Sequence, residues 1–187
     1  MGLPEIFISF QTAAVSAITR SARGVLAVAV KDATAGGAAE AAYKSLAEVP
    51  EDKFSPENYR LLKLAFLAAP TKVWVLRVGE DAEKTYQALE RLRFDWLAAP
   101  GLEDARVMSF IKTLRNGGRG VKAVVANATA PDCEGIVNLC VSGLTLEDGA
   151  MEAKDYAVRV AALLAALPLT RSATYVNLPE VVGCDAL

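Results

Sequence analysis

The sequence predicts an α/β protein: a mostly parallel sheet flanked by helices, with an extended N-terminal strand or arm. Two observations lead to this prediction. Runs rich in β-branched residues alternate along the chain with segments of helical spacing, which is typical of βαβ units. The run at residues 25–30 is apolar throughout, as expected of a strand covered on both faces. Connections between parallel strands of this kind are right-handed.

The N-terminal 23 residues are predicted to form an arm and its lead-in. Residues 3–10 alternate as a strand does, and Pro4 suits a strand start or a sheet edge. The alternation gives two faces: Ile6, Ile8 and Phe10 on one, and Glu5, Phe7 and Ser9 on the other. Residues 12–21 are rich in alanine, and we interpret them as a short helix capped by Thr12.

The rest of the chain is predicted to alternate between strands and helices. A helix begins after Ser55, with Pro56 at its first position and Glu57 near the positive end of its dipole, and it ends before Pro70. The other predicted helices are residues 81–91, 103–116 and 152–167. Strands or extended runs are predicted at residues 25–30, 41–49, 72–78, 94–99, 121–126, 133–141 and 144–146, the last followed by a turn.

Composition excludes several classes of function. The 187 residues carry a net charge of −2 without a basic stripe, so we expect no nucleic-acid binding. The apolar run at residues 157–169 is interrupted by Arg159, and no run reaches the roughly 20 residues of a membrane span. The chain has no histidine, and its three cysteines, Cys133, Cys140 and Cys184, have no metal-ligand spacing, so we expect no metal, cofactor or hydrolytic chemistry. A mean hydropathy of +0.27 hints at apolar surface that meets a partner.

The remaining polar motifs leave two alternatives open. Gly117, Gly118 and Gly120 close a predicted helix instead of opening one, so they fit a helix C-cap and not a phosphate loop. The carboxylates at residues 80–81 and 103–104 fit capping of helix N-termini. Asn127, Thr129 and Asp132 form a polar loop, so a small α/β ligand-binding or enzymatic domain that uses the Asn127–Asp132 loop is one alternative. An adaptor domain that forms closed dimers or rings is the other.

Several segments resemble the short contractile tail sheath proteins of phages and phage-like bacteriocins of Gram-positive bacteria. Residues 94–100, FDWLAAP, are similar to the family's FDYLAVP strand. The most specific likeness is AALLAALPLTRSATY at residues 161–175, followed by LPEV at 178–181. Further segments match in the same order: residues 2–6, 20–25, 111–115, 122–127 and 134–138.

The resemblance implies a structural subunit and not an enzyme. Such subunits polymerise around an inner tube and contract to drive it through a cell envelope. Their terminal arms add strands to the sheets of neighbouring subunits, so Ile6, Phe7, Ile8, Ser9 and Phe10 are the expected partner-binding residues. The implied partners are other sheath subunits and the tube protein, in a virion tail or phage-like particle assembled in the host cytoplasm.

The resemblance also implies a domain organisation. We expect an arm and lead-in at residues 1–23 and an α/β sheath core at 24–175. Residues 176–187 are expected to begin the connection to a C-terminal domain that this sequence lacks. With only one of the two arms, the chain alone is expected to be monomeric.

Overall fold

The computed structural model describes residues 24–127, 131–168, 170–174 and 176–185. Its large sheet contains the strands β1 (Val25–Val30), β2 (Glu40–Tyr43), β3 (Lys72–Arg77), β4 (Trp96–Ala98), β5 (Lys122–Val125) and β6 (Ile136–Asn138). Its helices are α1 (Pro56–Phe66), α2 (Ala82–Arg91), α3 (Asp104–Asn116) and α4 (Ala153–Ala166). A small sheet contains β7 (Ser142–Leu146), β8 (Gly149–Ala150) and β9 (Val181–Asp185).

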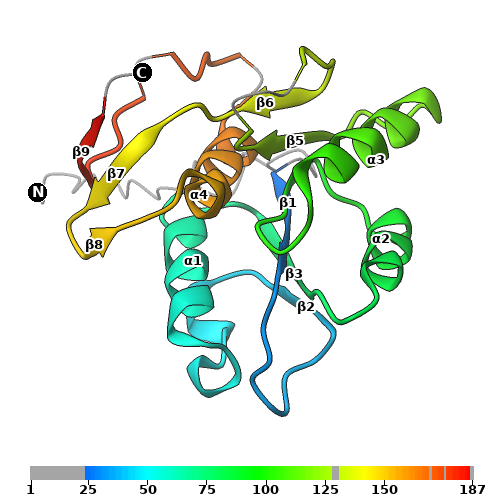
Figure 1. The fold of residues 1–187 in the computed structure, drawn as a ribbon, viewed down its shortest axis with the longest axis horizontal. Coiled ribbons are helices and arrows are strands. Elements are labelled where there is room, and N and C mark those ends of the chain that lie inside the picture. The colour runs from blue at the N-terminus through cyan, green and yellow to red at the C-terminus, as the bar shows by residue number, and fades with distance from the viewer. Residues whose placement is uncertain (1–23, 128–130, 169, 175, 186–187) are drawn as a thin grey trace, which may run out of the picture.

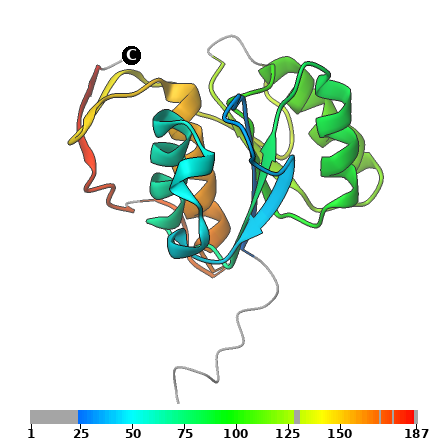
Figure 2. The same cartoon turned by 90° about the horizontal axis from the view of Figure 1, so that it is seen from below.

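The elements form four layers (Figures 1 and 2). Helices α2 and α3 cover one face of the large sheet, and α1 and α4 cover the other. The small sheet lies on the far side of α1 and α4, where Leu64 and Tyr156 from these helices pack against Leu144 and Leu146 of β7. The helix pair α1–α4 is therefore sandwiched between two sheets.

The large sheet confirms the predicted fold class. Its strand order is β2-β3-β1-β4-β5-β6, and only β2 runs antiparallel to its neighbour. The chain passes from β1 to β3 on one side, and then crosses back to β4 on the other side of β1. Such a reversal is the topological switch point of a doubly wound sheet, and its carboxyl edge is where ligand sites of this architecture lie.

The strand β1 shows why the central strands are apolar on both faces. Leu26, Val28 and Val30 enter the core beneath α1 and α4. Ala27 and Ala29 enter the core beneath α2 and α3 instead. Side chains alternate across a strand, so a strand covered by helices on both faces needs apolar residues at every position.

Local sequence signals place the helix starts as predicted. The Ser55 hydroxyl accepts a hydrogen bond from the Asn58 amide at 3.2 Å, and Pro56 occupies the first helical turn. The Asp81 carboxylate caps α2 by accepting from the Glu83 amide at 3.0 Å. Glu103 precedes α3 but makes no capping hydrogen bond through its side chain, so the capping prediction is confirmed for α2 only.

Two predicted elements differ from the structure. The strand predicted at 41–49 spans only Glu40–Tyr43, and 3-10 turns follow at Leu46–Glu48 and Glu51–Lys53. The extended run predicted at 133–141 contains the three-residue strand β6. Pro50 lacks a backbone N–H, and the apolar residues near it pack as a turn against α1 instead of continuing the sheet edge.

Candidate functional site

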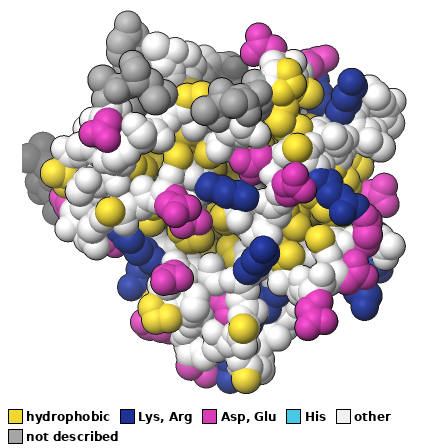
Figure 3. Space-filling model, viewed as in Figure 1, with side chains coloured by type: hydrophobic (Ala, Val, Ile, Leu, Met, Phe, Trp, Pro, Cys, Tyr) yellow, Lys and Arg dark blue, Asp and Glu magenta, His cyan; other side chains and the backbone are white. Residues whose placement is uncertain are grey.

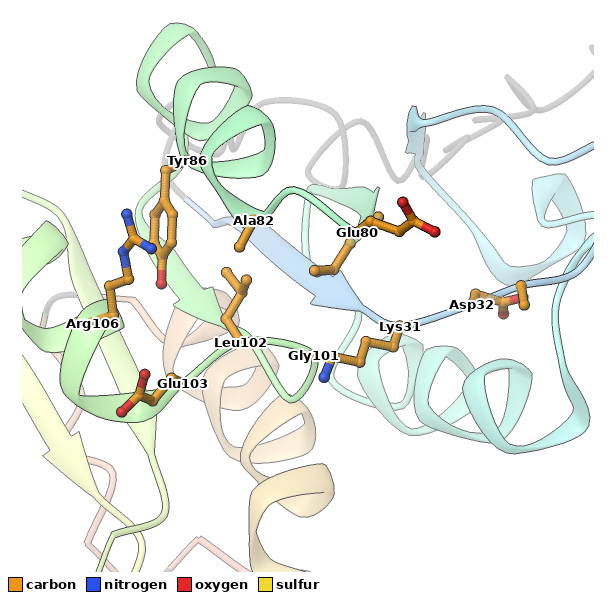
Figure 4. Close-up of a pocket in the computed structure, with 12 residues that line it drawn as sticks. Lys31, Asp32, Glu80, Ala82, Tyr86, Gly101, Leu102, Glu103 and Arg106 are labelled. Atoms are coloured by element: carbon orange, nitrogen blue, oxygen red, sulfur yellow. The ribbon is translucent and has the colours of Figure 1, made fainter.

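The carboxyl edge of the large sheet contains a cavity of about 750 Å³ (Figure 4). It lies where the chain leaves β1, β3 and β4, at the topological switch point. Its charged or hydroxyl-bearing lining residues are Lys31, Asp32, Glu80, Tyr86, Glu103 and Arg106. In Figure 4 the carboxylates of Glu80 and Glu103 lie on opposite sides of the cavity. This edge is therefore the first candidate for a chemical site.

Asp32 is a structural carboxylate. Its side chain is fully buried and accepts hydrogen bonds from the Thr34 amide at 2.8 Å, the Ser55 amide at 3.0 Å and the Asn58 side-chain amide at 2.7 Å. Burial raises the pKa of Asp32, but these hydrogen bonds outweigh it and hold the pKa far below the ordinary value. Arg77 lies 3.5 Å away and adds a positive neighbour. Asp32 thus fastens the loop after β1 to the start of α1.

The hydroxyl of Tyr86 has no hydrogen-bonded base beside it in the described part of the chain. Its hydroxyl is buried without a hydrogen bond, and the Arg106 guanidinium lies 5.0 Å from the ring centroid. Burial, together with the negative charges of Glu103 and Asp104, raises the pKa of Tyr86 to about 12. The phenol therefore stays protonated near neutral pH and cannot act as a base. None of the described lining residues is a serine, cysteine or histidine, so the cavity contains no Ser–His or Cys–His pair.

The alternative site at Asn127–Asp132 is described at its two ends only. The Asn138 side chain accepts from the Asn127 amide at 2.9 Å and donates to the Asn127 carbonyl at 2.5 Å. Asn138 thus holds the chain at the end of β5 as a neighbouring strand would. Asp132 is exposed, and Thr129 lies outside the described residues. The polar character of this loop is explained in part by backbone closure between β5 and β6.

A buried ion pair joins the small sheet to α4. Arg159 is only 5% exposed, and its Nε donates to Glu180 Oε1 at 2.6 Å. The Tyr156 hydroxyl donates to the same oxygen at 2.9 Å. Burial raises the pKa of Glu180, but the hydrogen bonds from Arg159 and Tyr156 bring it below the ordinary value. The same burial and the Glu180 charge raise the pKa of Tyr156. Glu180 immediately precedes β9, so this cluster fixes the segment that completes the small sheet.

Open strand edges are the other surface that can bind a partner. Strands β2 and β6 end the large sheet, and β8 and β9 end the small one. An edge strand presents unpaired N–H and C=O groups to which another chain can add. On β9 four of five residues are exposed, and Val182 is 67% exposed. The face seen in Figure 3 shows basic and acidic side chains interspersed between apolar ones, and not a basic stripe.

The predicted binding residues and the described surface do not overlap. Ile6, Phe7, Ile8, Ser9 and Phe10 lie outside the described residues. The small sheet and its buried anchor were not predicted as a unit. A signal for the anchor existed in the sequence, since Arg159 interrupts an apolar helix and a buried arginine needs a carboxylate.

Within the described ranges, no cluster of three or more potential ligands is arranged to hold a metal ion. No described helix is long and apolar enough to cross a membrane.

Comparison with known proteins finds similarity to tail sheath proteins. No protein-family model matches the chain. A tail sheath protein of the Clostridium phage phiCD119 is 32% identical over 197 aligned positions, which cover 96% of this chain and 53% of the phage protein. The chain therefore spans about half the length of this relative.

Two crystal structures share the fold. The sheath tail protein from Listeria innocua matches with a TM-score of 0.72 at 17% identity, covering 87% of this chain and 60% of that one. The sheath tail protein from Desulfitobacterium hafniense matches with a TM-score of 0.73 at 15% identity, covering 96% and 66%. The predicted resemblance to tail sheath proteins is confirmed, in sequence by the phage protein and in fold by both structures.

Proposed function

We propose that this chain is a structural subunit of a contractile tail sheath, which polymerises around an inner tube and shortens to drive that tube through a cell envelope. The single observation behind the proposal is the 32% identity to a tail sheath protein over 96% of the chain. The two sheath structures of the same fold support it. The role is architectural and not enzymatic, in keeping with a switch-point cavity whose buried carboxylate serves to hold the backbone.

The arm residues Ile6, Phe7, Ile8, Ser9 and Phe10 would bind the neighbouring subunit by strand addition. An added strand gains main-chain hydrogen bonds, while every second side chain fills a pocket on the receiving sheet. Many such links along a polymer reinforce one another through multivalency. The inner tube protein is the second proposed partner, and assembly would take place in the host cytoplasm before the tail is complete.

The described edge best suited to receive an arm is β9. Its own partner β7 already contributes Leu144 and Leu146 to the apolar layer over α1 and α4, and Val181 of β9 packs against the same layer. A further strand beside β9 would place alternate apolar side chains, such as those of Ile6 and Ile8, along the continuation of this layer. The large-sheet edge β6 offers only three paired residues.

Negative-stain electron microscopy of the complete gene product tests the proposal. Tubes or stacked rings are expected from the intact protein and should disappear when residues 1–10 are deleted. Ile8→Asp should abolish them as well, since it puts a charge on the docking face, whereas Ser9→Asp on the opposite face is the matched control and should retain them. Uniform small particles from every sample would contradict self-assembly through the arm.

A second pair of variants tests the receiving edge. Val182→Lys places a charge on β9 and should weaken polymer formation, because charged side chains on edge strands oppose strand addition. Val137→Lys on the β6 edge should leave polymers intact. The reverse outcome would assign the receiving edge to β6 and leave the sheath proposal standing.

A further inference from the structure

An apolar groove lies beside the point where the described chain begins. It has a volume of about 520 Å³ and runs between the end of α1 and the turn after β2. Its apolar lining residues are Leu46, Phe66, Leu67, Ala69 and Pro70. Leu67 is 61% exposed, a large apolar surface for a residue directly after a helix. A cavity of about 150 Å³ holds a benzene molecule, so this groove has room for several aliphatic side chains.

The chain enters the fold at the wall of this groove. The Thr71 amide donates to the Gly24 carbonyl at 3.0 Å, and Thr71 itself lines the groove. Gly24 has φ +101°, and a Cβ there would lie 3.0 Å from the Thr71 hydroxyl oxygen. Gly24, to which residue 23 is bonded, is therefore held beside a residue that lines the same groove as Leu67.

The sequence of that segment suits such a groove. Over residues 12–23, Ala14, Val15, Ile18 and Ala22 fall within about 100° on a helical projection, the width of a core-facing stripe. Ser16, Arg20 and Arg23 fall on the opposite side. A helix of these twelve residues would be about 18 Å long and would need an apolar surface to be stable in water.

Charge favours one orientation for such a helix in the groove. Lys44 and Lys63 lie at the groove, and like charges so close would repel Arg20 and Arg23. Docking with the apolar stripe toward Leu67 turns both arginines to solvent, and the small residues Ala14 and Ala22 allow close approach on either side of Ile18.

We propose that residues 12–23 dock as a short amphipathic helix in the groove lined by Leu46, Phe66, Leu67 and Pro70 of their own chain. The helix covers Leu67 and ties the lead-in to α1 and to the start of β3. Residues 1–10 then leave the subunit from a fixed position and in a fixed direction. The inference does not depend on polymer formation, because the occupant and the groove belong to one molecule.

Limited digestion with trypsin tests the docking in the full 187-residue chain. Arg20 and Arg23 are the tryptic sites within residues 1–23, so cleavage there reports on the lead-in alone. When docking is fast relative to cleavage, the cleavage rate follows the population of the undocked segment. Val15→Glu puts a charge on the docked face and should accelerate cleavage at both arginines by about tenfold or more. Ser16→Glu adds the same charge one residue away on the outer face, and it should leave the rate within about twofold.

A matched pair tests the groove from its other side. Leu67→Glu should accelerate cleavage at Arg20 and Arg23 as Val15→Glu does, whereas Val137→Glu alters an exposed apolar residue on β6 and should not. Mass spectrometry identifies the cut sites, and a cooperative urea transition in each variant shows that the core is folded. Equal rates in wild type, Val15→Glu and Leu67→Glu would overturn the proposal. Protection that grows with protein concentration would also overturn it, because a second copy would then occupy the groove.

Discussion

Replacing Glu180 by glutamine should loosen the small sheet far more than its single lost charge suggests. Arg159 and Glu180 have side chains only 7% and 12% exposed, and Arg159 Nη1 is already buried without a hydrogen-bond partner among the described residues. Removing one partner of a buried ion pair leaves an uncompensated charge and typically costs about 3–5 kcal/mol. Glutamine keeps one acceptor oxygen for Tyr156, so we expect a loss of about 2–3 kcal/mol.

The loss should appear locally, since residues 176–185 can detach while the large sheet stays folded. Hydrogen exchange of the β9 amides measures this opening directly. Because 1.4 kcal/mol corresponds to a factor of ten, Glu180→Gln should accelerate exchange over Val181–Asp185 by roughly 30- to 150-fold. The core strand β1 should exchange at its wild-type rate. Acceleration of less than about threefold in β9 would refute the view that the buried pair holds this segment.

A control for this experiment lies in the turn of the same small sheet. Asp148 pairs with Arg60 through a hydrogen bond of 2.7 Å from Arg60 Nε, but its side chain is 59% exposed. Exposed pairs contribute about 0–1 kcal/mol, so Asp148→Asn should change β9 exchange only slightly. Equal effects from the two substitutions would mean that burial does not set the strength of the Glu180 contact.

The pH dependence of β9 exchange has a defined sign. The folded pKa of Glu180 is lower than its ordinary value of 4.5, so its ionised form stabilises the folded segment. That stabilisation is complete above the unfolded pKa and is lost as the pH falls through the folded pKa. Wild-type β9 should therefore lose protection in acid, after correction for the intrinsic exchange rate, and Glu180→Gln should show a flatter profile.

Three further substitutions test the core that positions these surfaces. Asp32→Asn should destabilise the protein by about 2–4 kcal/mol in urea unfolding, because a buried amide donor then faces the donors Ser55 and Thr34. The folded pKa of Asp32 is lowered, so the stability that its carboxylate provides is lost only as the pH falls below about 3.9. Asp32→Asn should remove this acid-sensitive part of the stability. Ser55→Ala should cost about 1 kcal/mol by thermal or urea unfolding, the usual value of a helix N-cap, and no measurable loss would contradict the cap. Gly101→Ala should cost at least about 2 kcal/mol, because the added Cβ would lie 2.7 Å from the Lys31 backbone nitrogen; retained stability would mean that β1 and β4 shift apart easily.

Local signals made most of the large sheet and its helices predictable. The start of α1 followed from Ser55 and Pro56, because a capping hydroxyl and a proline at the first helical position act within one turn of chain. The strand β1 followed from six apolar residues after Gly24, since a strand buried on both faces carries no polar position. Each of these signals lies within the element that it specifies.

The small sheet was harder to predict because its contacts join distant parts of the chain. The β7–β8 turn was visible in residues 144–149, but β9 pairs with β7 across 35 residues or more and with register shifts. Nothing within residues 181–185 indicates the partner strand. The Arg159–Glu180 contact likewise joins a helix to a segment 21 residues later. The predicted arm at Ile6–Phe10 stays a prediction, because a strand that completes another molecule's sheet has its partner outside the chain.

The cavity at the carboxyl edge of the large sheet and the corner at which the described chain begins lie at opposite ends of β1. The cavity lies at the carboxyl end of β1, whereas Gly24 lies at the opposite end, where a Cβ would be 3.2 Å from the Ala165 carbonyl oxygen near the end of α4. Gly24, where the described chain begins, and the end of α4 therefore lie at the same corner of the core. A subunit linked to its neighbours through the residues before Gly24 would transmit force to β1 directly and to α4 through this close approach. Both are among the most buried elements of the described fold. In the proposed sheath, the rigidity of this scaffold, and not the cavity at its carboxyl edge, would serve assembly.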